Sequence, residues 1–467
     1  MKRATVLTAL IALLCALDPC AVPADAGRIE FGRLGTVFLY GSASRASNVV
    51  LFVSGDGGWN KEVVDMARAL ASRGMFVAGI DIRRYLASLA RSAEPCLYPA
   101  ADFEALSKFI QKKLGFPSYR QPVLAGYSSG ASLVYGVLAQ APPNTFRGAI
   151  SLGFCPSLPI AKPLCTGSGL ANAQMPTGRQ VRLFPRESLE EPWIVLQGTI
   201  DKVCNAAAAA EFVKNVPSAG IVLLPRVGHG FGVQKRWLPQ FEAAFTGIAR
   251  EDGPTAAGRK GTLGDLPLIE LPAREPAKDL LAIILSGDGG WAGLDREVGR
   301  VLAQKGIAVV GLDSLRYFWT PRTPERLAAD LGRIMRHYLA AWGKSNVVLI
   351  GYSFGAEVLP FAMNRIPRDL LGHVRLAALL APGREADFEF HLADWLGGGS
   401  RKTSRPLLPE VEKLKNERVL CFYGEDERES LCRELLPGIG ERIPLKGGHH
   451  FGGRYASIAE MILDRIR

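Results

Sequence analysis

Short runs of apolar residues alternate with amphipathic segments along most of the chain. Stretches such as 61–73 and 294–304, in which apolar residues recur every three to four positions, predict helices. The apolar runs between such stretches predict strands at 48–53, 76–80, 122–125, 149–152, 193–197 and 221–224, and in the second half at 281–285, 308–312, 347–350, 377–380 and 419–422. Alternating strands and helices predict an α/β fold, with a mostly parallel sheet flanked by helices on both faces.

The chain also repeats its own motifs in one order. Ser-Gly-Asp-Gly-Gly-Trp occurs at 54–59 and 286–291, and Gly-Tyr-Ser at 126–128 and 351–353. A Gly-His pair with Phe two residues beyond the His follows in each half. Because the spacing differs while the order is kept, we predict two homologous domains with different loops. Their expected ranges are 27–250 and 280–467, joined by a linker at 251–279 that is rich in Gly, Pro, Ala and charge.

The first 26 residues have the features of a secretory signal peptide. Lys2 and Arg3 precede an apolar stretch at 6–16, and a small-residue cleavage site ends at Ala26. No later stretch reaches about 18 uninterrupted apolar residues, so we expect no transmembrane helix after this leader. The sequence therefore predicts an exported protein.

Export makes disulfides the expected use of the cysteines that follow the leader. Cys421 and Cys432 are alone in the second half and are expected to pair. The four cysteines of the first half allow three pairings, of which we favour Cys155 with Cys165 and Cys96 with Cys204. Metal binding is less favoured because no CxxC or HExxH motif occurs, and no metal or cofactor is predicted.

Composition is that of an ordinary globular protein, with 48% hydrophobic and 22% charged residues, which excludes a disordered chain. The 56 Lys and Arg exceed the 45 Asp and Glu, giving a net charge of +11. Residues 281–467 hold 26 basic and 23 acidic side chains, or +3, so +8 belongs to the first half. Export makes nucleic acid an unsuitable partner, and the basic first half suits anionic lipid headgroups.

A GxSxG motif lies at 126–130 and again at 351–355, each time after an apolar run and before a helical one. In this context the motif forms the sharp turn that exposes the nucleophilic serine of an α/β-hydrolase. The motif alone is common by chance, and its repetition in matching context is what favours the functional interpretation. We predict two tandem α/β-hydrolase-like domains with Ser353 and Ser128 as candidate nucleophiles.

The Gly-Asp-Gly-Gly loop after an early strand is where an α/β-hydrolase supplies part of its oxyanion hole. The alternative is a glycine-rich turn with a helix-capping Asp; a phosphate cradle is excluded because no Gly-Lys-Ser/Thr follows. The candidate backbone amides are those of Asp288, Gly289 and Phe354 in the second domain and of Asp56, Gly57 and Ser129 in the first.

The acid and the base of such a site follow the serine in the order Asp or Glu, then His. In the first half Asp201 lies just beyond a predicted strand and His229 follows the next strand. Ser128, Asp201 and His229 therefore form a second candidate triad.

The second half offers alternatives for both partners of Ser353. Counting from the preceding glycine favours Glu427 as the acid, whereas Asp426 is adjacent and Asp is the commoner triad acid. Alignment with the first half favours His449 over His450 as the base. Both pairs of alternatives stay open from the sequence.

Several motifs of the second half resemble the VirJ/AcvB family of bacterial virulence proteins. They are the Ser-Gly-Asp-Gly-Gly-Trp loop, Arg-Tyr-Phe-Trp at 316–319, Arg-Thr-Pro-Glu at 322–325, Gly-Tyr-Ser-Phe-Gly-Ala at 351–356 and Gly-Gly-His-His-Phe at 447–451. The resemblance implies a periplasmic α/β-hydrolase-fold protein of Gram-negative bacteria, linked to type IV secretion, virulence or acid tolerance. It also implies hydrolysis of lysyl-phosphatidylglycerol to phosphatidylglycerol and lysine, with Ser353 as the active serine. The first half lacks the 316–325 motifs.

A loop of the second half, 384–395, carries acidic and aromatic residues, whereas its counterpart at 154–169 has no acidic residue. We hypothesise that Asp387, Glu389 or Asp394 receives the ammonium groups of a lysyl ester, and Trp319 is a further substrate-binding candidate. The alternative is a solvated charged loop. At the level of function, the alternative to an esterase acting on an aminoacylated phospholipid is a non-catalytic periplasmic binding factor or chaperone for type IV secretion components.

Overall fold

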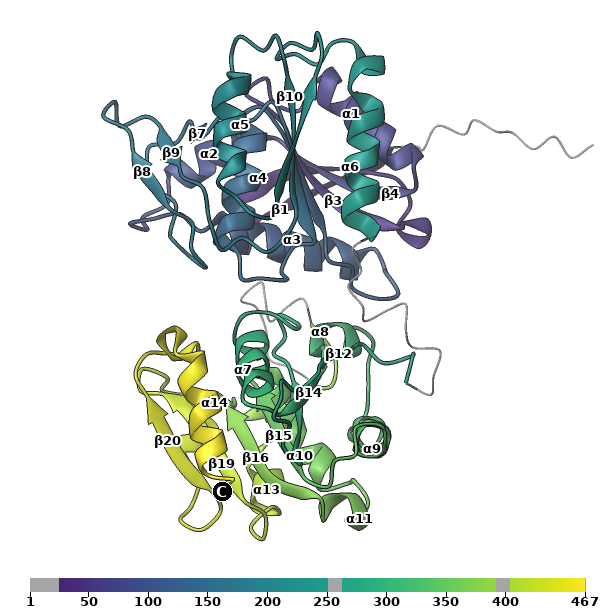
Figure 1. The fold of residues 1–467 in the computed structure, drawn as a ribbon, viewed down its shortest axis with the longest axis vertical. Coiled ribbons are helices and arrows are strands. Elements are labelled where there is room, and N and C mark those ends of the chain that lie inside the picture. The colour runs from purple at the N-terminus through teal and green to yellow at the C-terminus, as the bar shows by residue number, and fades with distance from the viewer. Residues whose placement is uncertain (1–24, 251–262, 392–403, 467) are drawn as a thin grey trace, which may run out of the picture.

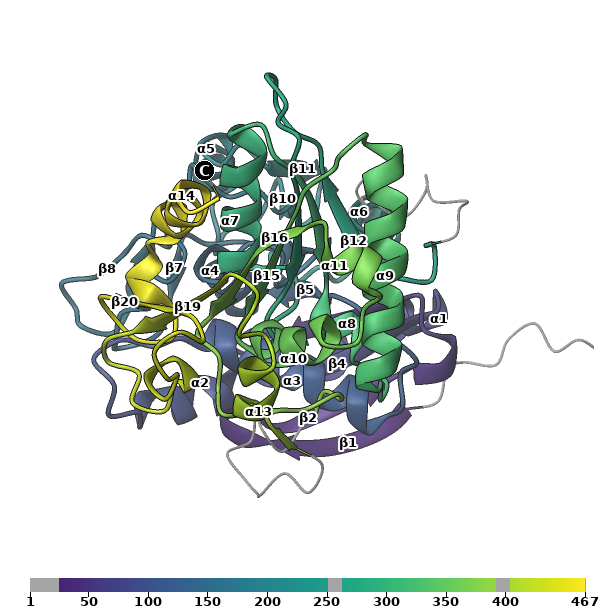
Figure 2. The same ribbon diagram turned by 90° about the horizontal axis from the view of Figure 1, so that it is seen from below.

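The computed structural model describes residues 25–250, 263–391 and 404–466, so most of the predicted leader lies outside the described residues. Two α/β units lie one above the other along the long axis, the first coloured purple to teal and the second green to yellow (Figure 1). The view from below shows the sheet of each unit between its helices (Figure 2). Each unit has a mostly parallel sheet flanked by helices, and the predicted α/β fold class is confirmed.

The first unit is built on an eight-stranded sheet. Its order is β1 (Asp25–Phe31), β2 (Gly35–Tyr40), β4 (Met75–Ile80), β3 (Asn48–Val53), β5 (Val123–Tyr127), β6 (Gly148–Leu152), β10 (Trp193–Gly198) and β11 (Ala219–Leu224). From β4 to β11 the strands are parallel, and β1 and β2 join antiparallel at one edge.

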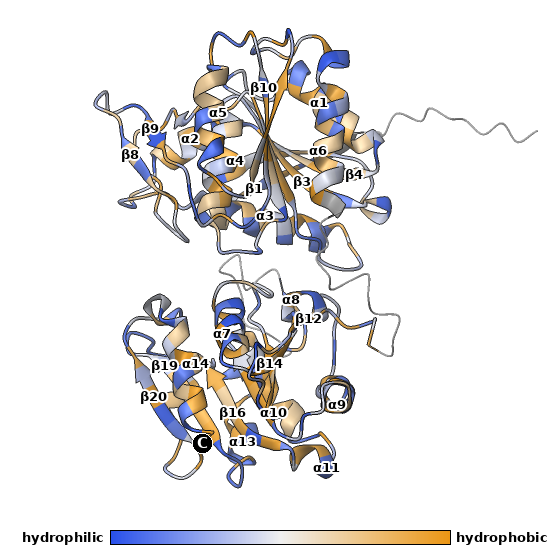
Figure 3. Cartoon of the chain, in the orientation of Figure 1, coloured by the Kyte–Doolittle hydropathy of each residue, from blue (hydrophilic) through white to orange (hydrophobic). Residues whose placement is uncertain are grey.

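Helices cover both faces of this sheet and bury a separate apolar cluster on each. One face packs against α2 (Ile82–Ala90), α3 (Pro99–Lys113), α4 (Ser129–Gln140) and α5 (Ala206–Lys214). The other packs against α1 (Lys61–Ser72) and α6 (Leu238–Arg250). The strands are mostly apolar and the outer helix faces polar, as Figure 3 shows. A small antiparallel sheet of β7 (Ser157–Leu158), β9 (Val181–Leu183) and β8 (Asn172–Gln174) is inserted after β6.

The second unit repeats the plan with seven strands. Their order is β12 (Leu268–Leu271), β14 (Ala308–Leu312), β13 (Leu281–Leu285), β15 (Val347–Tyr352), β16 (Val374–Leu380), β19 (Val419–Gly424) and β20 (Glu441–Leu445). One face packs against α8 (Ser314–Tyr317), α9 (Pro324–Ala341), α10 (Phe354–Met363), α11 (Arg368–Leu371) and α13 (Leu408–Glu412), the other against α7 (Gly293–Gln304) and α14 (Tyr455–Asp464). A two-stranded ribbon, β17 (Glu385–Ala386) with β18 (Arg405–Pro406), lies apart.

Every strand predicted from the apolar runs is present, but edge strands were missed. The expected linker was wrong at its C-terminal end, because β12 lies inside it and pairs antiparallel with β14. This strand is short and flanked by Pro267 and Pro272, which hid it in a proline-rich segment. β20 was missed because it carries Glu441, Arg442 and Pro444, residues tolerated at the edge of a sheet.

The described residues contain three disulfides. The predicted Cys421–Cys432 bond is confirmed. The favoured pairing in the first half is wrong, because the bonds are Cys96–Cys165 and Cys155–Cys204. Cys155 follows β6 and Cys204 follows the adjacent parallel strand β10, so both reach the same sheet edge, with Cα atoms 5.1 Å apart. Three disulfides indicate an oxidising, exported environment.

None of the helices in the described ranges combines the length and apolar character that crossing a bilayer requires.

Helix α3 of the first unit packs against the second unit. The Lys112 ammonium lies 2.9 Å from the Glu389 carboxylate and donates to the Trp319 carbonyl at 2.8 Å. The Trp319 indole nitrogen in turn donates to the Phe116 carbonyl at 2.7 Å. Tyr119 joins a small buried apolar cluster with Trp319 and two other residues of the second unit, so the units share a packed interface.

Candidate active site

In each unit the candidate serine occupies a strained turn between a central strand and a helix. Ser128 separates β5 from α4 and has φ of 56°, and Ser353 separates β15 from α10 and has φ of 49°. A positive φ is rare for a residue with a side chain and persists only where the surroundings enforce it. This is the backbone geometry of a nucleophile elbow, which exposes the serine hydroxyl above the sheet edge.

The glycines of both GxSxG motifs are required by close packing. A Cβ at Gly126 would lie 2.2 Å from the Gly130 carbonyl oxygen, and one at Gly351 would lie 2.5 Å from that of Gly355. A Cβ at Gly130 or Gly355 would in turn meet the backbone at the end of β3 or β13. No larger residue fits at these positions, so the motif follows from the turn's geometry.

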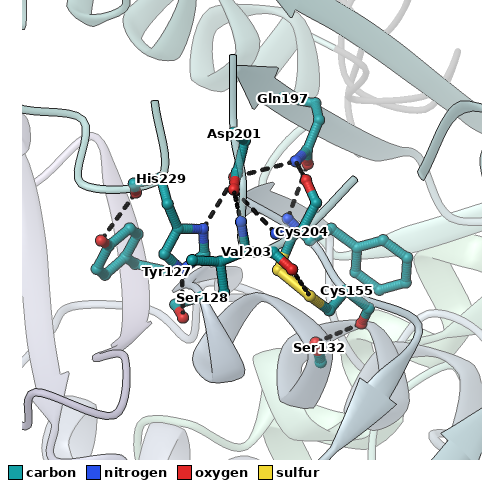
Figure 4. The surroundings of a disulfide bond; sticks show 10 residues. Tyr127, Ser128, Ser132, Cys155, Gln197, Asp201, Val203, Cys204 and His229 are labelled. Carbon is teal, nitrogen blue, oxygen red and sulfur yellow. Dashed lines mark hydrogen bonds and ion pairs between the residues drawn. A yellow bond between two sulfur atoms is a disulfide. The ribbon is translucent and has the colours of Figure 1, made fainter. Parts of the chain in front are cut away.

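The first unit assembles a complete hydrogen-bonded chain of serine, histidine and aspartate (Figure 4). Ser128 Oγ lies 2.9 Å from His229 Nε2, and His229 Nδ1 lies 2.8 Å from Asp201 Oδ2. The other oxygen of Asp201 accepts hydrogen bonds from the backbone amides of Val203 and Cys204 at 2.8 and 2.9 Å. The carboxylate is therefore held by its own loop, which the Cys155–Cys204 bond ties to the end of β6.

The second unit assembles the same chain from Ser353, His449 and Glu427. Ser353 Oγ lies 2.9 Å from His449 Nε2, and His449 Nδ1 lies 2.5 Å from Glu427 Oε1. His450 does not contact the serine but pairs through Nδ1 with the Tyr352 hydroxyl at 2.8 Å. Asp426 is exposed, one residue before the acid that the structure brings to the histidine.

Electrostatics tune the His449 imidazole. Burial alone would lower its pKa, but the hydrogen bond and charge of Glu427, together with the charges of Asp288 and Glu357, raise the pKa above the ordinary value of 6.5. The neighbouring His450 has a lowered pKa, because of its burial and the charge of His449. His449 thus accepts a proton more readily than an ordinary histidine, as a general base requires.

This raised pKa predicts the pH dependence of the second site. The base must be neutral to accept the serine proton, so kcat/KM should rise with pH and reach half its maximum above pH 6.5. Removing the negative charge in Glu357→Gln lowers the pKa of His449 and should move this midpoint to lower pH. The measurement is a pH profile with a small acetyl ester in a Ser128→Ala background. An unchanged midpoint in Glu357→Gln would contradict the electrostatic coupling.

The glycine-rich loops after β3 and β13 lie beside the serines. A Cβ at Gly55 would lie 2.9 Å from the Ser128 Cβ, and one at Gly287 would lie 3.7 Å from the Ser353 Cβ. The residues that follow these glycines, Asp56 and Asp288, are therefore near the nucleophile, as are Ser129 and Phe354 at the first turn of α4 and α10. Gly57 and Gly289 lie one residue further along the loops.

The loop of the second unit is also contacted by the first unit. The ammonium of Lys108, in α3, donates to the Asp288 carbonyl at 3.4 Å, and the Asn144 amide donates to the Trp291 carbonyl at 2.6 Å. Lys108 is only 1% exposed and pairs with Glu104 at 2.7 Å. Both ends of the loop at 288–291 are thus hydrogen-bonded by side chains of the other unit.

The two sites differ in the charge around the triad. Counting from the glycine that ends β10 or β19, three exposed positions are neutral in the first unit and acidic in the second: Thr199, Ile200 and Val203 correspond to Glu425, Asp426 and Glu429. Four residues after the serine, the first unit has Ser132 and the second has Glu357. Asp56 and Asp288 are common to both sites. The acid loop and the first turn of α10 in the second unit therefore carry acidic residues where the first unit has neutral ones, and the charges of Asp288 and Glu357 act on His449.

The residues expected to bind substrate lie elsewhere or outside the described residues. Glu389 and Trp319 belong to the interface between the units. Asp387 is 3% exposed and pairs with His391 at 3.1 Å. Asp394 lies outside the described residues. The structure does not bring the three described side chains to Ser353, and their role in substrate binding stays a prediction.

Sequence reasoning did not single out Glu357, Glu425 or Glu429. The signal was present in the internal repeat, because aligning the two elbows and the two acid loops shows that acidic residues replace neutral ones at these positions. Within the described ranges, no group of three or more His, Cys, Asp and Glu side chains could hold a metal ion.

Each unit has a mostly parallel sheet between helices, a strained serine after a central strand and a histidine–carboxylate pair hydrogen-bonded to that serine. These features define the scaffold of the α/β serine hydrolases, and the chain contains it twice. The model of the family described as bacterial virulence protein (VirJ) matches residues 47–151 and 279–467. The chain belongs to this family, as its motifs predicted. No curated protein sequence matches the chain.

Among solved structures, the chain is similar to esterases and related hydrolases that cover about half of it. Est1E from Butyrivibrio proteoclasticus is 14% identical, with a TM-score of 0.34, covering 48% of this chain and 99% of its own. XC6422 from Xanthomonas campestris, described as an α/β serine hydrolase, is 20% identical, with a TM-score of 0.32, covering 50% and 97%. A dienelactone hydrolase described as putative, from Klebsiella pneumoniae, is 14% identical, with a TM-score of 0.35, covering 48% and 98%.

Proposed function

We propose that the second unit is a periplasmic serine esterase that hydrolyses the aminoacyl ester of lysyl-phosphatidylglycerol to phosphatidylglycerol and lysine. The observation that carries the proposal is the triad of Ser353, His449 and Glu427, with acidic residues on its acid loop and on the first turn of α10 where the first unit has neutral ones. A lysyl ester carries one ammonium group on the carbon next to its scissile carbonyl and a second at the end of its side chain. Carboxylates around the nucleophile attract such a substrate and orient it.

The reaction follows from the geometry of the triad. His449 Nε2 takes the proton of Ser353 Oγ as the oxygen attacks the ester carbonyl, and Glu427 holds the imidazole and stabilises its positive charge. The backbone amides of Asp288 and Phe354 bind the oxyanion. His449 then protonates the departing glycerol oxygen, and water releases lysine from the acyl-enzyme by the same steps in reverse order.

The partners in this proposal are an aminoacylated phospholipid at the outer surface of the inner membrane and components of type IV secretion. The proposal of type IV secretion components rests on the family alone. A cleavable leader and three disulfides support a periplasmic location. The removal of lysine restores a net negative charge to the lipid headgroup. Such a change in surface charge connects the reaction to acid tolerance and virulence.

Charge removal at Glu357 tests the substrate class. In Glu357→Gln we expect kcat/KM for a lysyl ester to fall about five- to tenfold, since a partly exposed carboxylate–ammonium pair contributes about 1 kcal/mol. The assay compares lysyl and acetyl esters of the same alcohol, in a Ser128→Ala background and above the pKa of His449. Glu441→Gln is the matched control, because Glu441 lies at the amino-terminal end of β20, away from the carboxyl ends of the strands that carry the triad, and pairs with Arg465. An equal loss for both esters would exclude recognition of the ammonium groups.

A further inference from the structure

We propose that the first unit is a second, independent esterase site that takes esters of uncharged, apolar acyl groups. Its nucleophile is Ser128, and its substrate class differs from that proposed for Ser353. Three features carry this inference: a complete triad, neutral residues at the loop and helix positions that are acidic in the second unit, and exposed apolar side chains beside the acid.

The Ser128 triad has hydrogen-bond distances similar to those of the triad in the second unit. The distances from Ser128 Oγ to His229 Nε2 and from His229 Nδ1 to Asp201 are 2.9 and 2.8 Å. The Tyr127 hydroxyl donates to the His229 carbonyl at 2.9 Å and so holds the histidine loop near the elbow (Figure 4). The positive φ of Ser128 directs its hydroxyl at His229, as an active nucleophile requires.

Burial raises the pKa of Tyr127 and of Tyr352, and beyond the acid of each triad the charges of Glu62 and Asp56 add to this in the first site, as those of Asp295 and Asp288 do in the second. Where the second unit has Glu357, the first has Ser132, whose hydroxyl is buried and donates to the Cys155 carbonyl at 2.6 Å (Figure 4). An acyl group with two ammonium groups therefore meets little of the attraction that it finds in the second unit.

Apolar side chains lie exposed on the loops that carry the acid and the base. Ile200 and Val203, on either side of Asp201, are 58% and 67% exposed, and Val233, four residues after His229, is 44% exposed. Large apolar side chains left in water beside a catalytic group favour an apolar ligand that covers them. The corresponding positions of the acid loop in the second unit are Asp426 and Glu429. The first site therefore suits the hydrocarbon of a carboxylic ester.

The proposed step is ester hydrolysis with no further reactant than water. Ser128 Oγ bonds to the acyl carbon while His229 takes its proton, and the bond from the acyl carbon to the alcohol oxygen breaks as His229 returns that proton to the alcohol. Water then attacks the acyl-serine, giving the free carboxylic acid and restoring the serine hydroxyl.

Two single variants of the full-length protein test the assignment. With the 4-nitrophenyl ester of octanoic acid as probe, Ser128→Ala is expected to lose at least 100-fold in kcat/KM and Ser353→Ala far less, because the first triad stays intact in the latter variant. With lysyl-phosphatidylglycerol vesicles the pattern reverses if the proposed function of the second unit holds. Octanoyl ester hydrolysis that survives in Ser128→Ala would overturn the inference about the first unit. Failure of lysyl lipid turnover in both variants and in the wild type would instead overturn the proposed function alone.

A charge graft tests the substrate class without touching the triad. Ile200→Asp with Val203→Glu gives the first site the acidic positions of the second and should lower kcat/KM for the octanoyl ester at least tenfold. Labelling of Ser128 by a small fluorophosphonate should persist in this variant, since the triad is intact. Val222→Glu, an exposed position on the edge strand β11, is the control and should leave both readouts unchanged. Unchanged octanoyl kinetics in the graft would refute the apolar specificity.

Discussion

Replacing Ser353 with Ala is expected to reduce hydrolysis of lysyl-phosphatidylglycerol by on the order of 10⁴-fold or more, because the nucleophile, base and acid act as one unit. His449 and Glu427 would remain bonded to each other, but no oxygen would be available to form the acyl-enzyme. The measurement is lysine release from vesicles that contain the purified lipid, together with the lipid composition of cells that produce the variant.

Ser128→Ala is the matched control for this experiment, because it removes the equivalent atom from the other unit and leaves the second site intact. Full turnover in Ser353→Ala would remove the proposed nucleophile. If lysine were also released at the same rate without protein, the result would favour the alternative of a non-catalytic binding factor.

The second large effect is expected at the acid. Glu427→Gln should lower kcat for the lysyl ester about 10³- to 10⁴-fold, because an amide cannot stabilise the charged imidazole or fix its tautomer. KM should change little, since Glu427 is bonded to His449 and not to the substrate. Asp426→Asn removes a neighbouring charge that makes no contact with the imidazole, and it should lower kcat by less than tenfold.

A comparison of these two variants by steady-state kinetics separates the two candidate acids. Equal losses in Asp426→Asn and Glu427→Gln would contradict the geometry, and so would a larger loss at Asp426. Glu427→Asp, which keeps the charge and shortens the side chain, should recover part of the rate.

The fold was largely predictable because its strands are buried on both faces. Continuous apolar runs such as 281–285 predict buried parallel strands from the local sequence alone. β12 and β20 lie at sheet edges, where one side is open and Glu270, Arg442 or Pro444 is tolerated. Their pairing depends on neighbours far along the chain, which a local pattern does not contain.

The site was predictable to the extent that its chemistry is local. The elbow glycines, the serines and the Gly-His motifs are fixed by short-range sterics, and they appear in the sequence. The choice between Asp426 and Glu427 depends on which carboxylate the turn after β19 directs at His449. Disulfide pairing depends on sheet order, which brings Cys155 and Cys204 together across 49 residues. The triad acid and the disulfide pairing can therefore be assigned only from the folded structure.

The hydrogen bonds from Lys108 and Asn144 to the loop at 288–291 bear on how a duplicated chain evolves. After duplication, either copy can in principle be shortened or lost while the other continues to work. Here the glycine-rich loop of the second unit takes two of its hydrogen bonds from the first unit, and a separated second unit would expose the Asp288 and Trp291 carbonyls to water. The two copies are therefore structurally coupled, since a deletion that removes Lys108 or Asn144 from the first half also changes the hydrogen bonds of the loop at 288–291 in the second.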